Sequence, residues 1–371
     1  MQAMAGIIGS AAALLGISGE RDKVGEIFGV AVEQTRRTRG VGSLLLETLV
    51  SEIGDSADFI LCEARTAEAG GWKVARNSGF LPIGFEPYAH AMPVGYESMV
   101  LTAIAQKQCR LARGQSPAVF MTDASRLLAK AVCEITSATL LDRLAPIAKS
   151  SLAESSSKRP SGEFRVRRDD KVGQKWFTSP EQVFDRDLGF IGLSPFQGVE
   201  QDTGRFDQSY YILSSAKGDI GAARVVYDRI DARARVLGLR SPDHSLGTIL
   251  LNGLVQHLEK AVKNAPLTTL VCIRADVPDI HAKIEASGFF PTAYFPGMIL
   301  VMDERRDVIQ YTRLTGRSLS ESTRMVTALE WPQARTVIEE VVRSVSRILR
   351  NSRFSARRAF FGCRPQVENG I

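Results

Sequence analysis

Apolar and polar positions alternate in blocks along the first hundred residues. The apolar runs at 5–17 and 25–33 are separated by the polar turn SGERDK, which is the pattern of a β-hairpin. Apolar residues then recur at helical spacing over 43–53, and a short apolar run at 58–64 predicts another strand. The blocks therefore predict, in order, two paired strands, a helix and a further strand.

More elements extend this order. Residues 69–80 predict a helix that ends near a glycine, a typical C-cap residue. Residues 81–91 and 97–105 have the pattern of a second hairpin. The stretch 103–148 is rich in Ala and Leu at helical spacing, and the Ser-rich segment 150–162 is typical of a linker.

After this linker the same order returns. Strands are predicted at 209–230, 232–239, 267–275 and 288–301, and helices at 245–262 and 279–287. The segment GFFPTAYFP at 288–296 aligns without a gap with GFLPIGFEP at 79–87, an offset of 209 residues. Cys272 and Cys62 stand at corresponding points of their strands. Because this period is far too long for a solenoid, we interpret it as the duplication of a whole domain.

The last predicted helix, at 320–358, is basic. Arg343, Arg347 and Arg350 recur at spacings of four and three. An apolar stripe accompanies them and comprises Ile338, Val341, Val342, Val345, Ile348 and Leu349. The pattern favours a helix packed on its own domain with a solvated arginine face. The alternatives are a dimer or partner contact, and binding to a membrane surface.

Composition narrows the class of protein. Of the 371 residues, 44% are hydrophobic and 24% are charged, which excludes wholesale disorder, collagen and multi-pass membrane architecture. The net charge of +6 is too small to hold nucleic acid by itself. The apolar run at 3–17 follows no Lys or Arg, so it predicts a buried strand and not a signal peptide. We expect a cytoplasmic protein with no nucleic-acid or membrane partner.

The sequence offers no support for a metal site or a disulfide framework. Its five cysteines are scattered without a CxxC spacing, and its four histidines neither cluster nor form an HExxH motif. We therefore expect reduced thiols and no metal.

The sharpest local signal is RTRGVG at 37–42, between a predicted strand and a predicted helix. Glycines let the backbone turn tightly and approach a ligand closely. The free N–H groups and positive dipole end of the helix suit a diphosphate, and Arg37 and Arg39 add charge-assisted bonds. The segment is not a P-loop, since no Gly-Lys-Ser/Thr ends it, and Leu45 breaks the GxGxxG pattern.

These residues resemble the GNAT superfamily of N-acetyltransferases. The family motif Arg/Gln-x-x-Gly-x-Gly/Ala is matched at every specified position by 37–42, and GEIFGVAVE and RNSGF are similar to the family's flanking strand and Gly-Phe ending. The resemblance implies an α/β (α+β) fold with two acetyltransferase-like domains, each a twisted, mostly antiparallel sheet flanked by helices. We expect an N-terminally shortened domain at 1–105, a helical connector and linker at 106–162, a second, degenerate domain at 163–312 and a basic helical tail at 313–371.

The resemblance also implies roles for particular residues. Acetyl-CoA, or another acyl-CoA, is the implied co-substrate, and an amine on a small molecule or a protein is the implied acceptor. The implied cofactor-binding residues are Val30, Val32, Arg37, Arg39, Gly40, Val41, Gly42 and Ser43. The backbone N–H of Val32 would polarise the thioester carbonyl, and Glu26 would be the general base. Ala75 stands where many members carry a tyrosine acid, which leaves Tyr88 as the phenol available for that role.

The chain departs from the family pattern in two places. Only a few residues precede the first predicted strand, so the helices that normally shape the acceptor site are missing, and the stretch 103–148 is one candidate for their replacement. In the second copy, alignment of Gly247 with Gly42 puts Pro242 at the arginine position and Ser245 at the first glycine. We expect that copy to keep the fold and to have lost CoA binding.

Two functions follow from these expectations. The first is an N-acyltransferase in which the amine attacks the acyl-CoA directly. The alternative is a non-catalytic acyl-CoA-binding or scaffold module with the same fold. In the N-acyltransferase, the degenerate copy would complete the acceptor cleft or a dimer surface.

Overall fold

The computed structural model describes residues 7–37, 39–105, 119–138, 145–146, 164–177, 189–193, 204–262, 266–324 and 326–351. These residues form a mixed α/β fold built on one large, mostly antiparallel sheet. The predicted linker at 150–162 and the end of the basic tail lie outside the described residues, and the predicted connector is described only at 119–138 and 145–146.

The first half of the sheet comes from residues 9–105. Its elements are β1 (Gly9–Leu15), β2 (Val24–Val32), α1 (Val41–Ile53), β3 (Phe59–Arg65), α2 (Ala69–Asn77), β4 (Leu81–Met92) and β5 (Gly95–Ala105). Short 3-10 turns lie at Glu20–Asp22 and Gln34–Arg36. The strands are ordered β1-β2-β3-β5-β4, and only β2 and β3 are parallel neighbours. The element order predicted from the sequence is confirmed here.

The second half continues the same sheet in the order β14-β15-β13-β12-β11-β10-β8. Its strands are β8 (Arg165–Arg168), β9 (Phe190–Ile191), β10 (Phe206–Ser215), β11 (Gly218–Asp228), β12 (Arg233–Arg240), β13 (Leu267–Arg274), β14 (Phe290–Val301) and β15 (Glu304–Thr315). Its helices are α6 (Asp170–Trp176), α7 (His244–Ala261) and α8 (Pro278–Ala286). Again only one pair of neighbours, β12 and β13, is parallel.

The two halves meet where β4 pairs with β14, at Gly84 opposite Ala293. A Cβ atom on Gly84 would lie 2.3 Å from the Cβ of Ala293, so the close approach of the two strands requires a glycine there. Both residues have the same place in their halves, since they are 209 positions apart.

The same hydrogen bond is made twice across this junction. The N–H of Ala91, in β4, donates to the Asp231 carboxylate over 2.8 Å, and the N–H of Leu300, in β14, donates to the Asp22 carboxylate over 2.8 Å. Both donors and both acceptors are 209 residues apart. Each half therefore contacts the other through an equivalent hydrogen bond, as the subunits of a symmetric dimer do.

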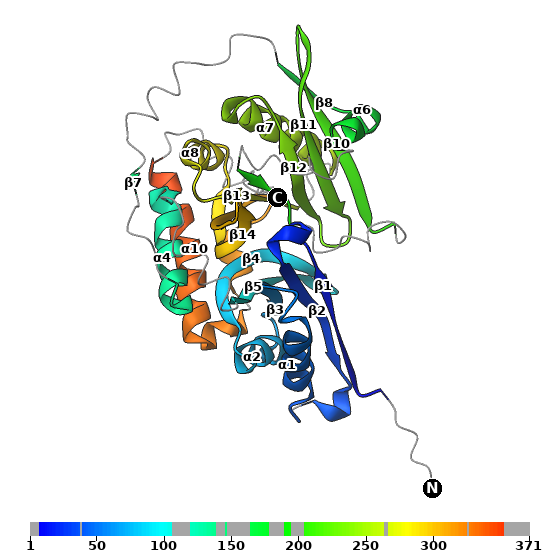
Figure 1. Cartoon of the computed structure of the whole chain (residues 1–371), viewed down its shortest axis with the longest axis vertical. Helices are drawn as coiled ribbons and strands as arrows, with labels where there is room; N and C mark the ends of the chain where they lie inside the picture. Colours follow the sequence, from blue (N-terminus) through cyan, green and yellow to red (C-terminus); the bar gives the residue numbers. More distant parts are fainter. Residues whose placement is uncertain are drawn as a thin grey trace, which may run out of the picture.

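Helices cover both halves and their junction (Figure 1). Helix α1 packs on β1 and β2, α2 on β3, and α7 on β8 and β11. Helices α4 (Asp123–Thr136) and α10 (Pro332–Asn351) lie side by side against β4 and β14. Two small strands, β6 (Phe120–Met121) and β7 (Ala145–Pro146), pair beside them.

The C-terminal helix begins later than the sequence predicted. In place of a helix from 320, the chain forms the single turn α9 (Leu319–Ser322) and the 3-10 turn Thr327–Glu330, and α10 begins only at Pro332, which cannot donate a backbone bond within a continuous helix. The apolar side of α10 is buried, and Arg343 pairs with Glu339 and Glu340. This is the packed helix with a solvated arginine face that the pattern favoured.

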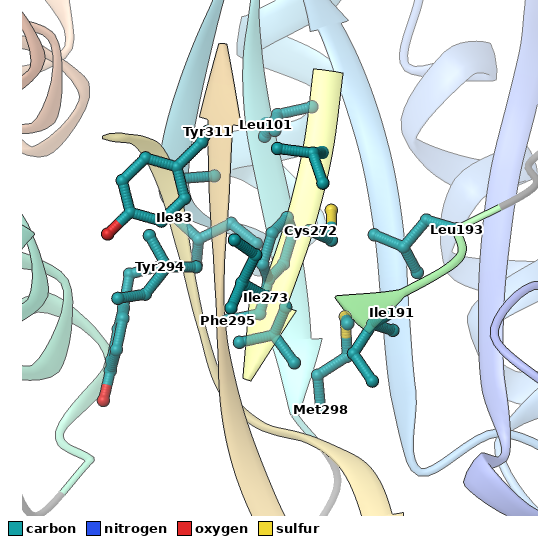
Figure 2. Close-up of a cluster of buried hydrophobic side chains, with 14 of the residues drawn as sticks. Ile83, Leu101, Ile191, Leu193, Cys272, Ile273, Tyr294, Phe295, Met298 and Tyr311 are labelled. Carbon is teal, nitrogen blue, oxygen red and sulfur yellow. The ribbon is translucent and has the colours of Figure 1, made fainter. Parts of the chain in front are cut away.

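One continuous core joins the two halves. Figure 2 shows part of it, where Ile83 and Leu101 of the first half lie near Cys272, Tyr294 and other side chains of the second half. The cysteines that the structure describes, Cys62, Cys133 and Cys272, are buried and form no disulfide with one another. Among the described helices, none combines the length and apolar character needed to cross a bilayer.

Candidate active site

The site predicted at 26–43 is built where β2 and β3 separate. The two strands are paired in parallel from Val24 opposite Phe59 to Ile27 opposite Cys62, and they diverge beyond that point. The cause lies in β2, whose pairing with β1 slips by one residue at a bulge that contains Gly29 in a left-handed conformation (φ +64°). Beyond Cys62, no described strand pairs with the edge of β3 that faces β2. We call this opening the first slot.

Val30 and Val32 line the arm of β2 that borders the first slot, and both are half-buried. The N–H of the next residue, Glu33, donates to the Ile8 carbonyl on the β1 side over 2.9 Å. Alternation along a strand therefore turns the N–H of Val32 to the opposite side, toward β3. Arg37 bends back so that its Nε donates to the Val32 carbonyl over 3.4 Å.

Helix α1 starts with its backbone donors free. Gly40 caps the helix in a left-handed conformation (φ +78°), with no side-chain cap, and its carbonyl accepts from the Leu44 N–H. Within the described part of the chain, the N–H groups of residues 39–43 have no acceptor. Arg39 and Gly40 are exposed. The predicted diphosphate loop is thus accessible, and its amides are unpaired among the described residues.

The two glycines of the motif have different physical causes. A Cβ atom on Gly40 would meet nothing within 4 Å, so Gly40 is required by its positive φ alone. A Cβ atom on Gly42 would lie 3.1 Å from Val74, so Gly42 lets α1 pack closely on α2. Both glycines were predicted to allow a ligand to approach, and in the fold Gly42 also has a packing role.

Glu26 lies on β2 just before the slot, and its residue surface is only 5% exposed. It lines a cavity of about 20 Å³, enough for one water molecule. Its Oε2 atom is buried and has no hydrogen-bond partner among the described residues. Burial, followed by the charge of Glu63, raises the pKa of Glu26 from 4.5 to about 8. A carboxyl group with such a pKa is suited to proton transfer near neutral pH.

Two more carboxylates and two guanidiniums surround this cavity. Arg233 pairs with Glu86, and Arg235 Nη2 lies 3.0 Å from Glu63 Oε1 and 3.8 Å from Glu86 Oε2. Gln310 Nε2 donates to Glu86 Oε1 over 2.9 Å. Burial opposes ionisation of Glu63, but the two arginines outweigh it and lower the pKa of Glu63.

The wall opposite Glu26 comes from the second half of the chain. Leu193, Arg235, Phe295 and Gln310 line the cavity, whereas α4 of the stretch 103–148 packs against α10, β14 and β4. Sequence reasoning missed these residues. A usable signal was present, because Arg235 stands 209 positions after Glu26 and thus at the equivalent place in the second half.

Tyr88 does not lie in a position that suits the expected acid role. It belongs to β4, and strands β3 and β5 separate β4 from β2 in the sheet. Its hydroxyl donates to the Ser318 carbonyl over 2.6 Å, and its ring contacts Tyr96 and the Arg317 guanidinium. The phenolic proton is therefore committed to the Ser318 carbonyl.

The equivalent opening between β12 and β13, the second slot, is filled. These strands pair in parallel only from Arg233 opposite Thr268 to Arg235 opposite Leu270. Beyond that point β9 pairs with the same edge of β13, and its buried Phe190 and Ile191 occupy the space that is open in the first half. Figure 2 shows Ile191 and the following Leu193 beside β13.

The backbone donors at the start of α7, the helix that follows the second slot, are also occupied. The Asp243 side chain caps α7 and accepts hydrogen bonds from the N–H groups of Ser245 and Leu246, at 2.7 and 2.9 Å. The corresponding donors of α1 carry no such cap. Asp243 is thus the N-cap of α7.

No group of His, Cys, Asp and Glu side chains within the described ranges is arranged to hold a metal ion.

Part of this chain is similar to several solved acetyltransferase structures. The ribosomal-protein-S18-alanine N-acetyltransferase of Escherichia coli is 19% identical, over 42% of this chain and 96% of that chain, with a TM-score of 0.32. A putative acetyltransferase of Sphaerobacter thermophilus is 16% identical, over 40% and 92%, with a TM-score of 0.29. The spermidine N-acetyltransferase of Vibrio cholerae, solved with CoA and spermine, is 11% identical, over 41% and 95%, with a TM-score of 0.31. The sequence matches no protein-family model, and none of the curated proteins matches it.

Proposed function

We propose that this chain is an N-acyltransferase that binds acetyl-CoA, or another acyl-CoA, in its first half and passes the acyl group directly to an amine. The observation that carries the proposal is the row of N–H groups at 39–43 at the start of α1, which have no acceptor among the described residues and begin with the exposed Arg39 and Gly40. They lie directly after the strand that borders the first slot. Such a helix start is a ready-made anion site, and a slot between two strand edges suits an extended pantetheine arm.

The proposal includes a tandem arrangement, with a second half that has kept the fold and lost the cofactor. Strands β1, β4 and β5 begin 209 residues before β11, β14 and β15. The reciprocal bonds to Asp22 and Asp231 fit two copies that once associated as a symmetric pair. The filled second slot and the Asp243 cap support the loss of CoA binding.

In this proposal the amine nitrogen attacks the thioester carbonyl carbon, the carbon–sulfur bond breaks, and CoA leaves as a thiolate. The N–H of Val32 stabilises the charge that develops on the carbonyl oxygen, a contact typically worth about 3 kcal/mol. Glu26 in its ionised form accepts the proton that the attacking amine releases. Protonation of the leaving thiolate is assigned to no side chain, since Tyr88 is held by the Ser318 carbonyl.

One observation favours the second candidate function, a non-catalytic acyl-CoA-binding module. Glu26 is almost fully buried, and its cavity has room for one water molecule and not for an acceptor side chain. In the enzyme, the proton must therefore pass through a water molecule or follow local opening of the cavity. In the binding module, Glu26 has only a structural role.

Calorimetric titration with acetyl-CoA tests the binding step that both functions share. We expect one equivalent per chain for the wild type. Gly40→Glu places a carboxylate beside the free amides and is expected to weaken binding at least about 100-fold through like-charge repulsion. Gly95→Glu is the matched control, since Gly95 is also an exposed glycine with positive φ and open space around it. Absence of binding by the wild type contradicts both functions.

Thiol release from acetyl-CoA with a panel of amines then separates the two functions. The enzyme releases CoA in proportion to acylated amine, and Glu26→Gln lowers the rate about 100-fold or more while acetyl-CoA binding persists. Binding without turnover for any amine favours the non-catalytic module.

A further inference from the structure

We propose that Arg235, on β12 of the second half, is a positioning residue for Glu26 of the first half: it pairs with Glu63 and lines the same cavity as Glu26, so that its charge controls the exchange of a proton by Glu26. The role in turnover rests on the proposed function. The proton on Glu26 does not, and it can be measured without substrate.

The two residues occupy the same place in the two halves and face the same cavity. They are 209 positions apart, and each lies where a parallel pair of strands begins to separate. Two identical residues at these places would put two like charges into one buried cavity. With a glutamate and an arginine at these places, one half contributes an acid to the cavity and the other half contributes a cation.

The ion pairs leave Glu26 as the one carboxylate of this cluster without a cation partner among the described residues. Arg233 pairs with Glu86, and Arg235 lies within 3.0 Å of Glu63, so two cations balance two anions. Glu26 has no ion pair among the described residues, and its buried Oε2 lacks a hydrogen-bond partner. A third negative charge would face both balanced carboxylates inside a poorly solvated cavity. Retention of a proton on Glu26 is therefore favoured.

Titratable and charged groups from five strands face or influence this cluster. They are Glu26 on β2, Cys62 and Glu63 on β3, Glu86 and His90 on β4, Arg233 and Arg235 on β12, and Cys272 on β13. Burial raises the pKa of Cys62 and of Cys272 to about 12, so both stay thiols. The hydrogen bond to Asp231 raises the pKa of His90, whose ring nitrogen lies 3.1 Å from that carboxylate.

Arg235 acts on Glu26 in two opposing ways. Its own charge favours the ionised form of Glu26, and by keeping Glu63 ionised it favours the protonated form. The balance sets where Glu26 titrates. This gives the second half a chemical task that does not require it to bind CoA.

The test is a carbon-13 NMR titration of the full chain labelled at glutamate carboxyl carbons. In the wild type we expect a carboxyl that titrates near pH 8 and disappears in Glu26→Gln. Burial also raises the pKa of Glu285 to about 8, so its signal is assigned separately with Glu285→Gln. In Arg235→Gln the Glu26 titration should move upward by at least about one pH unit, because the nearest favourable cation is lost. Arg235→Lys, which keeps the charge, should restore it.

A second variant covers the case in which Arg235→Gln does not fold. Glu63→Gln is nearly isosteric, and it releases Arg235 from its ion pair so that the guanidinium faces Glu26 alone. The Glu26 titration should then move downward by about one pH unit. Arg343→Gln, which breaks an exposed ion pair on α10, is the matched control and should leave the titration unchanged. The proposal is overturned if Glu26 titrates at the wild-type pH in Arg235→Gln or in Glu63→Gln.

Where the chain transfers acyl groups, the pH–rate profile adds a readout. Its acidic limb should shift with the Glu26 titration in each variant. Titration shifts without any turnover leave this inference intact and contradict only the enzymatic function, so the two failures are distinguishable.

Discussion

The two slots of the sheet show how little separates a ligand site from a structural element. Both slots arise where a parallel pair of strands diverges and a helix follows. In the first, the edge of β3 has no partner among the described strands, and α1 begins with uncapped amides. In the second, β9 occupies the edge and Asp243 caps the helix. The fold is shared, so the capacity to hold an extended anionic ligand depends on these local features.

The pair Glu26 and Arg235 extends the comparison to charge. A dimer of identical chains must carry the same residue at both places. Two halves joined in one chain are free of that constraint, and here one contributes an acid and the other a cation to one cavity. The two halves thus differ in a complementary way at the cavity that both of them line.

The largest expected effect concerns stability against pH in Glu26→Gln. Folding keeps a proton on Glu26 that the unfolded chain releases above the ordinary pKa of 4.5. This contribution to stability is complete below that pH and is lost as the pH rises through about 8. Between pH 5 and pH 9 the wild type should lose on the order of 5 kcal/mol that the variant retains. Urea unfolding across this range measures it.

Glu47→Gln, on the exposed surface of α1, is the control for that experiment and should follow the wild type. If the free energy of unfolding changes with pH in the same way for the wild type and Glu26→Gln, then Glu26 does not retain a proton in the folded chain. The contrast drawn between Glu26 and Arg235 is then wrong.

The next effect concerns the residue that fills the second slot. Phe190 is buried against β13, so Phe190→Ala should lower the free energy of unfolding by about 3 kcal/mol through the cavity it leaves. The stoichiometry of acetyl-CoA should stay at one per chain, because the Asp243 cap remains. A second equivalent bound by the variant would show that β9 alone closes the second slot.

A smaller effect is expected from the arginine beside the free amides. Arg39→Ala should weaken acetyl-CoA binding about tenfold by removing a charge-assisted contact to a phosphate. Arg240, at the end of β12 before α7, is the control in the second half. Arg240→Ala should leave the affinity unchanged. Equal losses for the two variants, measured by calorimetry, would contradict a single site in the first half.

The smallest effect is expected at the cap of α7. Asp243→Ala removes two hydrogen bonds to backbone amides and should destabilise the chain by about 1 kcal/mol. It should create no acetyl-CoA site while β9 fills the slot. Thermal unfolding with and without acetyl-CoA checks both statements, and an extra ligand-induced shift in this variant would assign the closure to the cap.

Local patterns were sufficient for most of the fold. Hydrophobic periodicity located the strands and helices of both halves, since each buries one regular face. The RTRGVG segment indicated an exposed helix start, and the repeated Gly-Phe-Pro segments indicated equivalent hairpins at an offset of 209. These features are encoded by neighbouring residues, which is why they could be read without the structure.

The rest depends on tertiary contacts that leave no local trace. Strand β9 has two residues and forms only because the edge of β13 is free. The second half supplies the wall facing Glu26, and no spacing near Glu26 encodes that. Tyr88 was predicted as the acid because a phenol can donate a proton. Its position is instead set by its hydrogen bond to the Ser318 carbonyl and its contact with Arg317. The role of Gly42 follows from a neighbour, Val74, on another helix.

Helix α10 has a consequence for how the chain acquires its structure during synthesis. It follows all the described strands in sequence, yet it packs on β4 of the first half. A nascent chain therefore carries an uncovered apolar face on β4 until residues 332–351 have left the ribosome. The final closure of the earliest-made half is a late event, and truncation before Pro332 is expected to leave a polypeptide that chaperones retain.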